Sequence, residues 1–438
     1  MNDLMKYAER VWTGEEDLSA YFGGALRKEG LRPVADDVWM WPATGNVYVF
    51  RSSEGLLLFD SGDRRTARDL HAAVRALTKD PVHSIVYSHG HVDHVLGVPP
   101  FDEEAAGGDG AGPRVIAHEA VQRRFDRYVL TAGYNTVINR RQFRAPRMTW
   151  PTVFRSPDRT YSDRTDLRIG GVDVHLRHGR GETDDATMAW FPDAGILCCG
   201  DFYAWNAPNA GNPQKVQRHV AEWARALRWM AGLGAKLLLP GHGVPIAGGD
   251  RIEETLTASA TFLEQLHDQV LELMNRGASL DEVLRGVTPD QSLLSRPYLR
   301  PTYDDPEFVV RNLWRCYGGW YDGDPSALRP APREELAGEI AGLAGGALVL
   351  ARRASDLVDR GQYRLAGHLA ELAALCVSAD DPGHAEVHAT RARVFSALEE
   401  SSGSFMARSV YGWTAARSRS LAAGGDGEHE ADGDRWAP

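Results

Sequence analysis

The sequence predicts an α+β protein in which a sandwich of two β-sheets flanked by helices is followed by an all-helical domain. Short apolar runs rich in aromatic and β-branched residues alternate with helical segments from about residue 38 to about residue 245, a pattern typical of sheets and helices packed in layers. After residue 250, apolar residues recur instead at spacings of three and four, the period of amphipathic helices. We therefore expect a sandwich domain with an N-terminal arm in residues 1–250 and a helical domain in residues 251–420.

The sandwich is predicted from strand-like runs separated by turns or helices. The first three runs, VWMW, NVYVF and GLLLFDSG, follow one another closely and predict a meander. A helical pattern (ARDLHAAVRAL) and a buried-strand pattern (HSIVYS) come next, and the alternation recurs with RVIAHE and a helix to about Tyr128. Later strand-like runs lie at 172–178, 187–192, 196–201 and 236–243.

The helical domain is predicted from segments 252–275, 333–352, 362–378 and 383–400. Small Ala and Gly residues on the last three segments allow helices to pack closely, within the chain or between two chains. The remaining residues, 421–438, are polar and rich in Gly and Asp. We expect this tail to be disordered, because it has too little apolar surface to bury.

Composition narrows the classes of partner. The formal net charge of -11 argues against nucleic acid or an anionic membrane. Four cysteines are too few for a disulfide framework, and no apolar run approaches the roughly 20 residues that span a membrane. The N-terminus lacks the apolar run of a signal peptide. We expect a soluble, cytoplasmic protein whose substrate is a small molecule.

The decisive motif is S-H-G-H-V-D-H at residues 88–94, directly after the strand-like run HSIVY. Imidazole and carboxylate groups are the ligands that zinc prefers. His89 and His91 can bind one metal ion, while Asp93 and His94 face a second. The alternative is a polar surface loop, but metal-ligating residue types recur at the ends of later strands.

Three of those later residues complete a candidate two-metal site. They are Glu182 in G-E-T, Asp201 in C-C-G-D and His242 in G-H-G, each next to a glycine that lets the backbone turn sharply. Singly, each is also compatible with an ordinary solvated turn. Taken together they supply the missing ligands, and we expect Asp201 to bridge the two metal ions. Asp60, in F-D-S-G, is expected to orient a ligand histidine.

These residues resemble the pattern of the metallo-β-lactamase superfamily, over about residues 35–245. Most members have a histidine where this chain has Glu182, and a carboxylate at this point resembles the alkylsulfatase branch. Residues 297–330 resemble the start of the alkylsulfatase dimerisation domain. The resemblance implies a metallo-β-lactamase αββα sandwich, two zinc ions and a homodimer. The sterol-carrier-like third domain of long alkylsulfatases is not expected in this chain.

The resemblance also implies hydrolysis of an organic sulfate monoester with an apolar group. Two zinc ions would activate water and bind the leaving oxygen, and attack at carbon, with C–O cleavage, is compatible with the branch. Asp93 and Asp201 are the catalytic carboxylates in this interpretation. The resemblance implies a histidine-containing stretch after the bridging acid that supplies the general acid, but no histidine lies between His178 and His219. The protonating role is therefore missing or has moved, and Tyr203 is the candidate for it.

Substrate-binding residues are predicted in two segments. Residues 131–143 offer hydroxyl, amide and guanidinium donors for a tetrahedral anion and resemble the family's sulfate-binding region. Asn209 matches an asparagine near the active site of the family. A solvated basic loop is the alternative for the first segment. The predicted set is Tyr134, Asn139, Arg140, Arg141 and Asn209.

Two other functions remain open at this point. The same metal-activated water serves a phosphate ester or pyrophosphate, a thioester or a lactone. A non-catalytic, metal-bearing scaffold, with the helical half as a partner module, is the second alternative.

Overall fold

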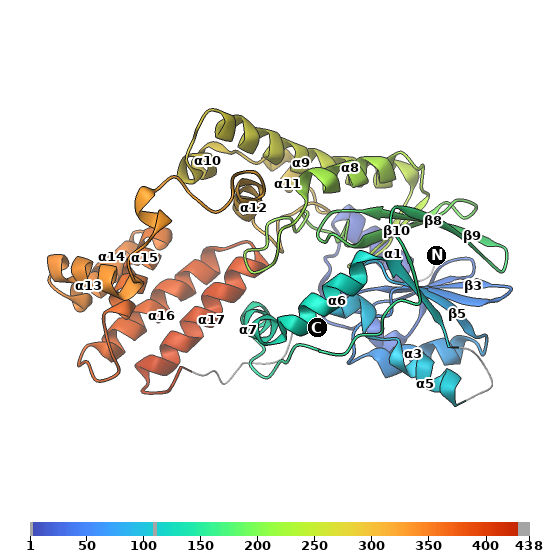
Figure 1. Cartoon of the computed structure of the whole chain (residues 1–438), viewed down its shortest axis with the longest axis horizontal. Coiled ribbons are helices and arrows are strands. Elements are labelled where there is room, and N and C mark those ends of the chain that lie inside the picture. The colour runs from blue at the N-terminus through green and yellow to red at the C-terminus, as the bar shows by residue number, and fades with distance from the viewer. Residues whose placement is uncertain (1–2, 108–111, 428–438) are drawn as a thin grey trace.

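The computed structural model describes residues 3–107 and 112–427. The first half of the chain forms layered sheets and helices, and the second half forms a group of helices beside them (Figure 1). The predicted fold class, a metallo-β-lactamase αββα sandwich followed by an all-helical region, is confirmed. Most of the predicted disordered tail, residues 428–438, lies outside the described residues, and the last described helix runs to Ala422.

The first sheet has seven strands in chain order. Its first four strands pair antiparallel, and the pairs from β4 to β7 are parallel. The parallel strands bring successive loops to one edge of the sheet. The strands are β1 (Arg32–Ala35), β2 (Val38–Trp41), β3 (Val47–Ser52), β4 (Gly55–Phe59), β5 (Val82–Val86), β6 (Arg114–His118) and β7 (Arg159–Tyr161).

The second sheet has six strands in the order β13-β12-β11-β10-β9-β8. Only β11 and β12 pair in parallel, and the other pairs are antiparallel hairpins. The strands are β8 (Arg164–Ile169), β9 (Val172–Gly179), β10 (Ala186–Phe191), β11 (Ile196–Gly200), β12 (Leu237–Pro240) and β13 (Ile246–Ala247).

Side-chain alternation along the strands places a core on each face of the first sheet. On β4, Leu57 and Phe59 face the second sheet, while Leu56 and Leu58 face the outer helical layer. Phe50 and Phe191 stack between the two sheets with ring centroids 4.0 Å apart. This packing fixes the two sheets relative to each other, so loops from both meet at one edge.

Helices lie on the outer faces of the sandwich and at its edge. They are α1 (Asp3–Thr13), α2 (Ser19–Phe22), η1 (Arg27–Glu29), α3 (Ala67–Leu77), α4 (Val92–Val95), α5 (Pro99–Ala106), α6 (Ala120–Leu130), α7 (Ala132–Phe143) and α8 (Val220–Ala231). Leu70 and Val74 of α3 are buried against the first sheet. The long helix α9 (Gly249–Asn275) packs along α8.

The second half is helical throughout, and one helix prediction was wrong. Segment 333–352 is not continuous, because Gly345 and Gly346 adopt positive φ angles of 96° and 116° that end one helix and begin the next. The elements are α10 (Leu280–Gly286), α11 (Gln291–Leu294), α12 (Pro306–Gly318), η2 (Pro325–Leu328), α13 (Arg333–Ala344), α14 (Ala347–Asp359), α15 (Tyr363–Leu375), α16 (His384–Ser401) and α17 (Phe405–Ala422).

The helices of this half pack mainly on one another. The helix α17 also reaches back to α7 of the sandwich half (Figure 1). Among the described helices, none combines the length and apolar character needed to cross a membrane.

Candidate metal centre

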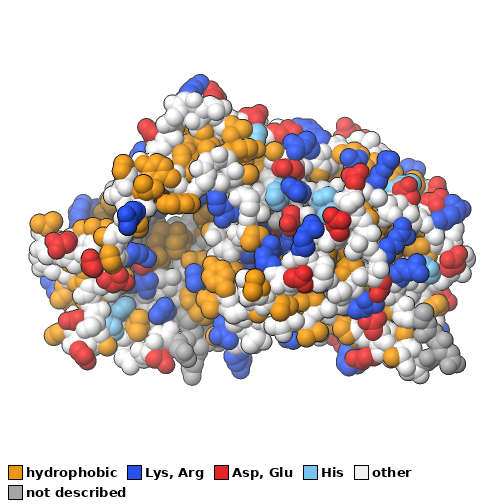
Figure 2. All heavy atoms as spheres, viewed as in Figure 1, with side chains coloured by type: hydrophobic (Ala, Val, Ile, Leu, Met, Phe, Trp, Pro, Cys, Tyr) orange, Lys and Arg blue, Asp and Glu red, His pale blue; other side chains and the backbone are white. Residues whose placement is uncertain are grey.

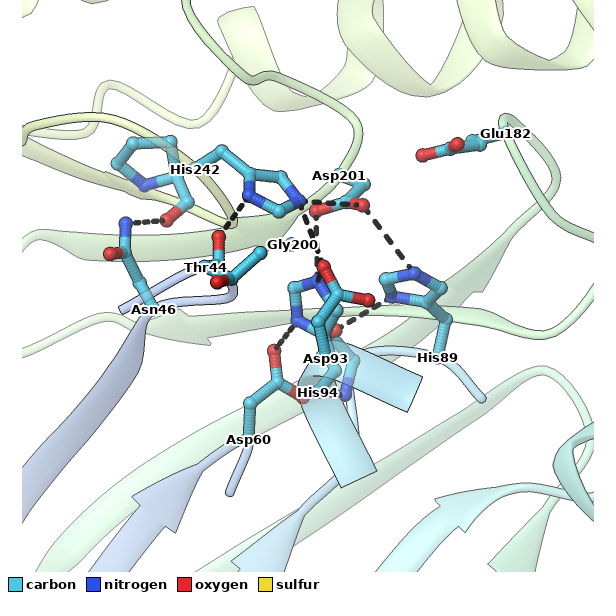
Figure 3. A network of polar contacts seen from close by, with 12 residues as sticks. Thr44, Asn46, Asp60, His89, Asp93, His94, Glu182, Gly200, Asp201 and His242 are labelled. Carbon is cyan, nitrogen blue, oxygen red and sulfur yellow. Dashed lines mark hydrogen bonds and ion pairs between the residues drawn. The ribbon is translucent and has the colours of Figure 1, made fainter. Parts of the chain in front are cut away.

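The candidate ligands come from the ends of strands in both sheets. The loop after β5 carries the first two histidines and leads into the short helix α4, which carries the next two ligands. The others follow β9, β11 and β12 of the second sheet. Figure 3 shows side chains from the two sheets facing one another across this edge. The structure therefore brings together all seven predicted ligands: His89, His91, Asp93, His94, Glu182, Asp201 and His242.

The seven side chains form two groups, and within each group the potential ligand atoms lie within 4.8 Å of one another. One group comprises His89, His91, Glu182 and Asp201, and the other comprises Asp93, His94 and His242.

Asp201 lies between the two groups. Its Oδ2 is 3.5 Å from Nε2 of His89 and 3.3 Å from Nε2 of His242, and its Oδ1 is 3.4 Å from Nε2 of His94. This is the location that a bridging carboxylate requires.

The buried atoms at the centre have the character of metal ligands. Nε2 of His89, Nε2 of His94 and Oδ1 of Asp201 are sealed from solvent and have no hydrogen-bond partner in the protein. Buried polar atoms are normally paired, and three that converge here fit a bound cation. Imidazole and carboxylate donors in this proportion suit zinc.

Contacts behind the histidines fix their orientation. Nδ1 of His94 donates to Oδ2 of Asp60 at 2.8 Å, and Nδ1 of His242 donates to the carbonyl oxygen of Thr44. Both bonds leave the Nε2 lone pair free to face the centre. The contact between Asp60 and a ligand histidine is the one expected from the sequence.

A buried arginine holds the loop that carries His89 and His91. Nε of Arg124 donates to Oδ2 of Asp185 at 2.6 Å, and the same oxygen accepts the backbone N–H of Gly90 at 3.1 Å. Burial alone would raise the pKa of Asp185, but Arg124 overcomes this effect and lowers that pKa to about 2. Asp185 therefore stays ionised and continues to accept the hydrogen bond from Gly90 that holds the loop.

Glycine is required where the backbone passes closest to Asp201. A Cβ atom on Gly241 would lie 2.0 Å from Oδ1 of Asp201. The neighbouring His242 can therefore follow a tight turn without displacing the carboxylate.

Glu182 is held by two residues from the segment that precedes α8. Its Oε1 accepts a hydrogen bond from Nδ2 of Asn209 at 2.9 Å and forms an ion pair with the guanidinium of Arg218. Burial raises the pKa of Glu182 to about 7 against the opposing effect of Arg218. Arg218 was not predicted from the sequence, because its only signal is a contact with a residue 36 positions away.

Comparison with known proteins matches the two halves of the chain separately. Residues 40–242 match the family model of the metallo-β-lactamase superfamily, and residues 279–420 match that of alkyl sulfatase dimerisation. The chain carries a metallo-β-lactamase domain followed by an alkyl sulfatase dimerisation domain. The predicted resemblance is thus confirmed for both.

The relatives of this two-domain chain are alkylsulfatases. It is 28% identical to a linear primary-alkylsulfatase of Pseudomonas sp. over 73% of this chain and 65% of that protein. It is 25% identical to an (R)-specific secondary-alkylsulfatase of Pseudomonas sp. over 84% of this chain and 58% of that protein. The chain therefore spans less than two thirds of the length of either relative.

A solved structure shares the fold of both domains. The stereoselective inverting sec-alkylsulfatase Pisa1 from Pseudomonas sp. matches 92% of this chain and 66% of its own, with a TM-score of 0.78 and 22% sequence identity.

The dimerisation domain contacts the segment of the metallo-β-lactamase domain that holds Glu182. Oδ2 of Asp304 accepts the backbone N–H of Gly211 at 2.7 Å. Nδ2 of Asn312, on α12, donates to the carbonyl oxygen of Arg218 at 3.0 Å. A Cβ atom on Gly211 would lie 2.1 Å from the backbone nitrogen of Val309. The two domains are therefore in close contact beside the candidate metal centre.

The predicted substrate-binding residues fall in different places. Asn209 contacts Glu182, and Asn139 is buried on α7, where its Oδ1 accepts a hydrogen bond from Lys215. The Arg140 guanidinium instead donates to the carbonyl oxygen of Met148 at 2.8 Å. Tyr134 is 66% exposed, and Arg141 is half-buried on the same helix. One helix face, rather than the whole segment, therefore points inward.

The structure does not bring Tyr203 to the candidate metal centre. Its side chain is 2% exposed within the apolar core, and its hydroxyl donates to the carbonyl oxygen of Tyr298 at 3.3 Å. Burial raises the pKa of Tyr203 well above its ordinary value. Both observations argue against the protonating role assigned from the sequence.

Proposed function

We propose that this chain is a metal-dependent hydrolase of organic sulfate monoesters, with two zinc ions at the candidate metal centre. The observation that carries the proposal is the seven-ligand cluster with a carboxylate, Glu182, in the place where most superfamily members have a histidine. Support comes from the alkylsulfatase relatives, although the chain spans only part of their length.

The ligands divide between the two ions as the two groups of atoms suggest. His89, His91 and Glu182 would hold one ion, and Asp93, His94 and His242 would hold the other, with Asp201 shared. Bound there, the two ions would lower the pKa of water toward about 7 and stabilise negative charge on the leaving oxygen.

The residues around the ligands supply positioning and charge balance. Asp60 and Asp185 hold the ligand loop, while Asn209 and Arg218 orient Glu182, and the charge of Arg218 opposes the rise in its pKa that burial causes. Sulfate is a weak base and a good leaving group, so C–O cleavage would release it without a protonating side chain. The proposed reaction is therefore compatible with the location of Tyr203 in the core.

We further propose that two copies of the chain associate through the helical domain, residues 251–420. The match to an alkyl sulfatase dimerisation model supports this proposal. Large apolar side chains are exposed on this domain, among them Trp320 at 70% and Leu343 at 90%. Figure 2 shows such side chains gathered at the upper left, over the region of α9, α10 and α12. Light scattering should give twice the mass of one chain, and a single-chain mass at assay concentration would exclude the dimer.

Turnover in ¹⁸O-labelled water tests the proposed reaction. Zinc-loaded protein is given primary, secondary and cyclic alkyl sulfates, and released sulfate is followed with time. Label in the alcohol product would establish attack at carbon, whereas label in the sulfate would establish attack at sulfur. If the metal-loaded protein hydrolyses none of these sulfates, the proposal is wrong, and phosphate esters, thioesters and lactones are the substrates to test next.

A further inference from the structure

Lys215 lies on the segment between β11 and α8, close to the candidate metal centre. Its ammonium group donates to Oδ1 of Asn139 on α7 at 2.8 Å. The same group lies 5.7 Å from the ring centroid of Trp150. The side chain is half-buried between these two residues, so its charge has a fixed location.

The ammonium group of Lys215 lies within electrostatic range of the candidate ligands but forms no ion pair with them. It interacts favourably with Glu182 and Asp93, one from each group of ligands, but forms no ion pair of 4.0 Å or less with a carboxylate in the described part of the chain. Burial, followed by repulsion from Arg218, lowers the pKa of Lys215 to about 7. A half-buried cation without a counter-ion is costly, and an anionic ligand would relieve that cost.

The neighbouring arginines are already neutralised. The guanidinium of Arg218 is paired with Glu182, and that of Arg124 is paired with Asp184 and Asp185. Arg140 is bonded to a backbone carbonyl. Among these cations, Lys215 is the one whose charge remains available to a ligand.

Further buried polar atoms near Lys215 lack partners in the protein. They include the indole Nε1 of Trp150, whose ring lies beside the ammonium group, and the side-chain amide of Gln214, the preceding residue. Both carry N–H groups that can donate hydrogen bonds to an oxyanion. Lys215 is therefore accompanied by other buried polar groups that lack partners, rather than being an isolated charge.

We propose that Lys215 binds the singly charged head group of the substrate and thereby selects an anionic ester over a neutral one. This inference rests on the proposed function and specifies the group that recognises the sulfate. The bond to Asn139 and the contacts of the dimerisation domain with Gly211 and Arg218 hold Lys215 in position for this role.

Binding of two inert analogues tests the proposal without turnover. The zinc-loaded full chain is titrated by calorimetry with a long-chain alkyl sulfonate, which keeps the anionic head group but has no ester bond. A methyl alkyl sulfone of the same chain length supplies the neutral counterpart. The proteins compared are wild type, K215M, K215R and K236M, the last being an exposed lysine that precedes β12.

We expect K215M to weaken sulfonate binding by roughly 10- to 100-fold, the usual effect of losing a hydrogen bond to a charged group. Sulfone binding should not change, because it involves no charge. K215R should lose less sulfonate affinity than K215M, and K236M should match wild type. N139L, which frees the ammonium group without removing it, should weaken sulfonate binding by a smaller factor than K215M.

Equal sulfonate affinity in wild type and a folded K215M would overturn the inference, as would a parallel loss of sulfone binding. Failure of the proposed function is distinguishable from both. Absence of sulfate-ester turnover together with Lys215-dependent sulfonate binding would reject the hydrolase reaction and keep the anion site. Sulfate-ester turnover without Lys215-dependent sulfonate binding would keep the hydrolase reaction and reject the anion site.

Discussion

The carboxylate of Asp60 accepts a hydrogen bond from Nδ1 of His94 at 2.8 Å, and neither side chain is more than 1% exposed. Asp60 follows β4 in a left-handed conformation with φ of 66°. Asp and Asn both adopt this conformation more readily than most residues. Its other oxygen accepts the N–H of Ser88 at 2.6 Å. Asp60 therefore positions one ligand histidine and the start of the loop that carries two more.

Replacing Asp60 with Asn should reduce zinc affinity by roughly 10- to 100-fold, the usual effect of losing a carboxylate behind a ligand histidine. The substitution keeps the shape and the backbone conformation but removes the charge. Competition with a chelator measures the affinity. D69N, in the exposed first turn of α3, serves as the control and should bind zinc as wild type does. Unchanged affinity in D60N would mean that Asp60 has no influence on His94 as a ligand.

Glu182→His should weaken metal binding, although histidine is the residue that most superfamily members have there. The Arg218 side chain is 4% exposed and paired with Glu182, and the substitution would leave its charge buried without that partner. Loss of one member of a buried pair costs about 3 kcal/mol. Urea unfolding of the metal-free protein should reveal this loss, and calorimetry should show weaker zinc binding.

The double variant E182H/R218M checks the cause. Removal of the unpaired guanidinium should restore part of the lost stability. If the double variant is no more stable than E182H, the destabilisation comes from the imidazole itself and not from Arg218.

Gly211→Ala should destabilise the contact between the two domains. The added methyl group would lie 2.1 Å from the backbone nitrogen of Val309, so α12 or the segment before α8 must move. We expect a loss of about 1–3 kcal/mol in the free energy of unfolding, together with weaker sulfonate binding. The matched control is G338A on α13, where a Cβ meets no atom within 4 Å. That variant should gain about 0.5–1 kcal/mol.

The stability of the helical domain should fall on acidification because of His388. Burial, then the positive charges of His384, Arg391 and Arg417, lower the pKa of His388 to about 4. Between about pH 6.5, the ordinary value for histidine, and pH 4, the unfolded chain binds a proton that the folded chain does not. The free energy of unfolding therefore decreases as the pH falls through this window.

Urea unfolding of metal-free wild type and H388Q between pH 7 and pH 4.5 tests this effect. The variant should show a smaller loss of stability across the range, whereas H368Q, at an exposed position of α15, should behave as wild type. Parallel curves for H388Q and wild type would rule out a contribution from His388.

The ligands of the candidate metal centre were predictable because their residue types and positions form a local pattern in the sequence. Four of them lie between His89 and His94, and Asp201 and His242 each follow an apolar run that ends in a glycine turn. Strand order then brings these turns to one edge of the sandwich. The split at Gly345 and Gly346 was missed because the apolar spacing continues across it, whereas the positive φ angles are visible only in the backbone.

Residues that act through contacts with distant parts of the chain were not predictable in this way. Arg218 and Lys215 have no local motif, and their roles follow from contacts with Glu182 and Asn139. Tyr203 was assigned to the site because it follows Asp201 in a stretch that contains no histidine. The chain turns after β11 and places that ring in the core instead, a direction that one sequence does not specify.

Gly211 of the sandwich packs closely on Val309 of the helical domain, so the two domains must fit each other at this contact. One side of this contact is encoded before residue 220 and the other after residue 300, and an extra methyl group on Gly211 would force one of them to move. A chimera that inherits its sandwich from one parent and its helices from another would mismatch the two halves. A graft that moves the helical domain onto another sandwich should therefore carry residues 209–219 together with α12.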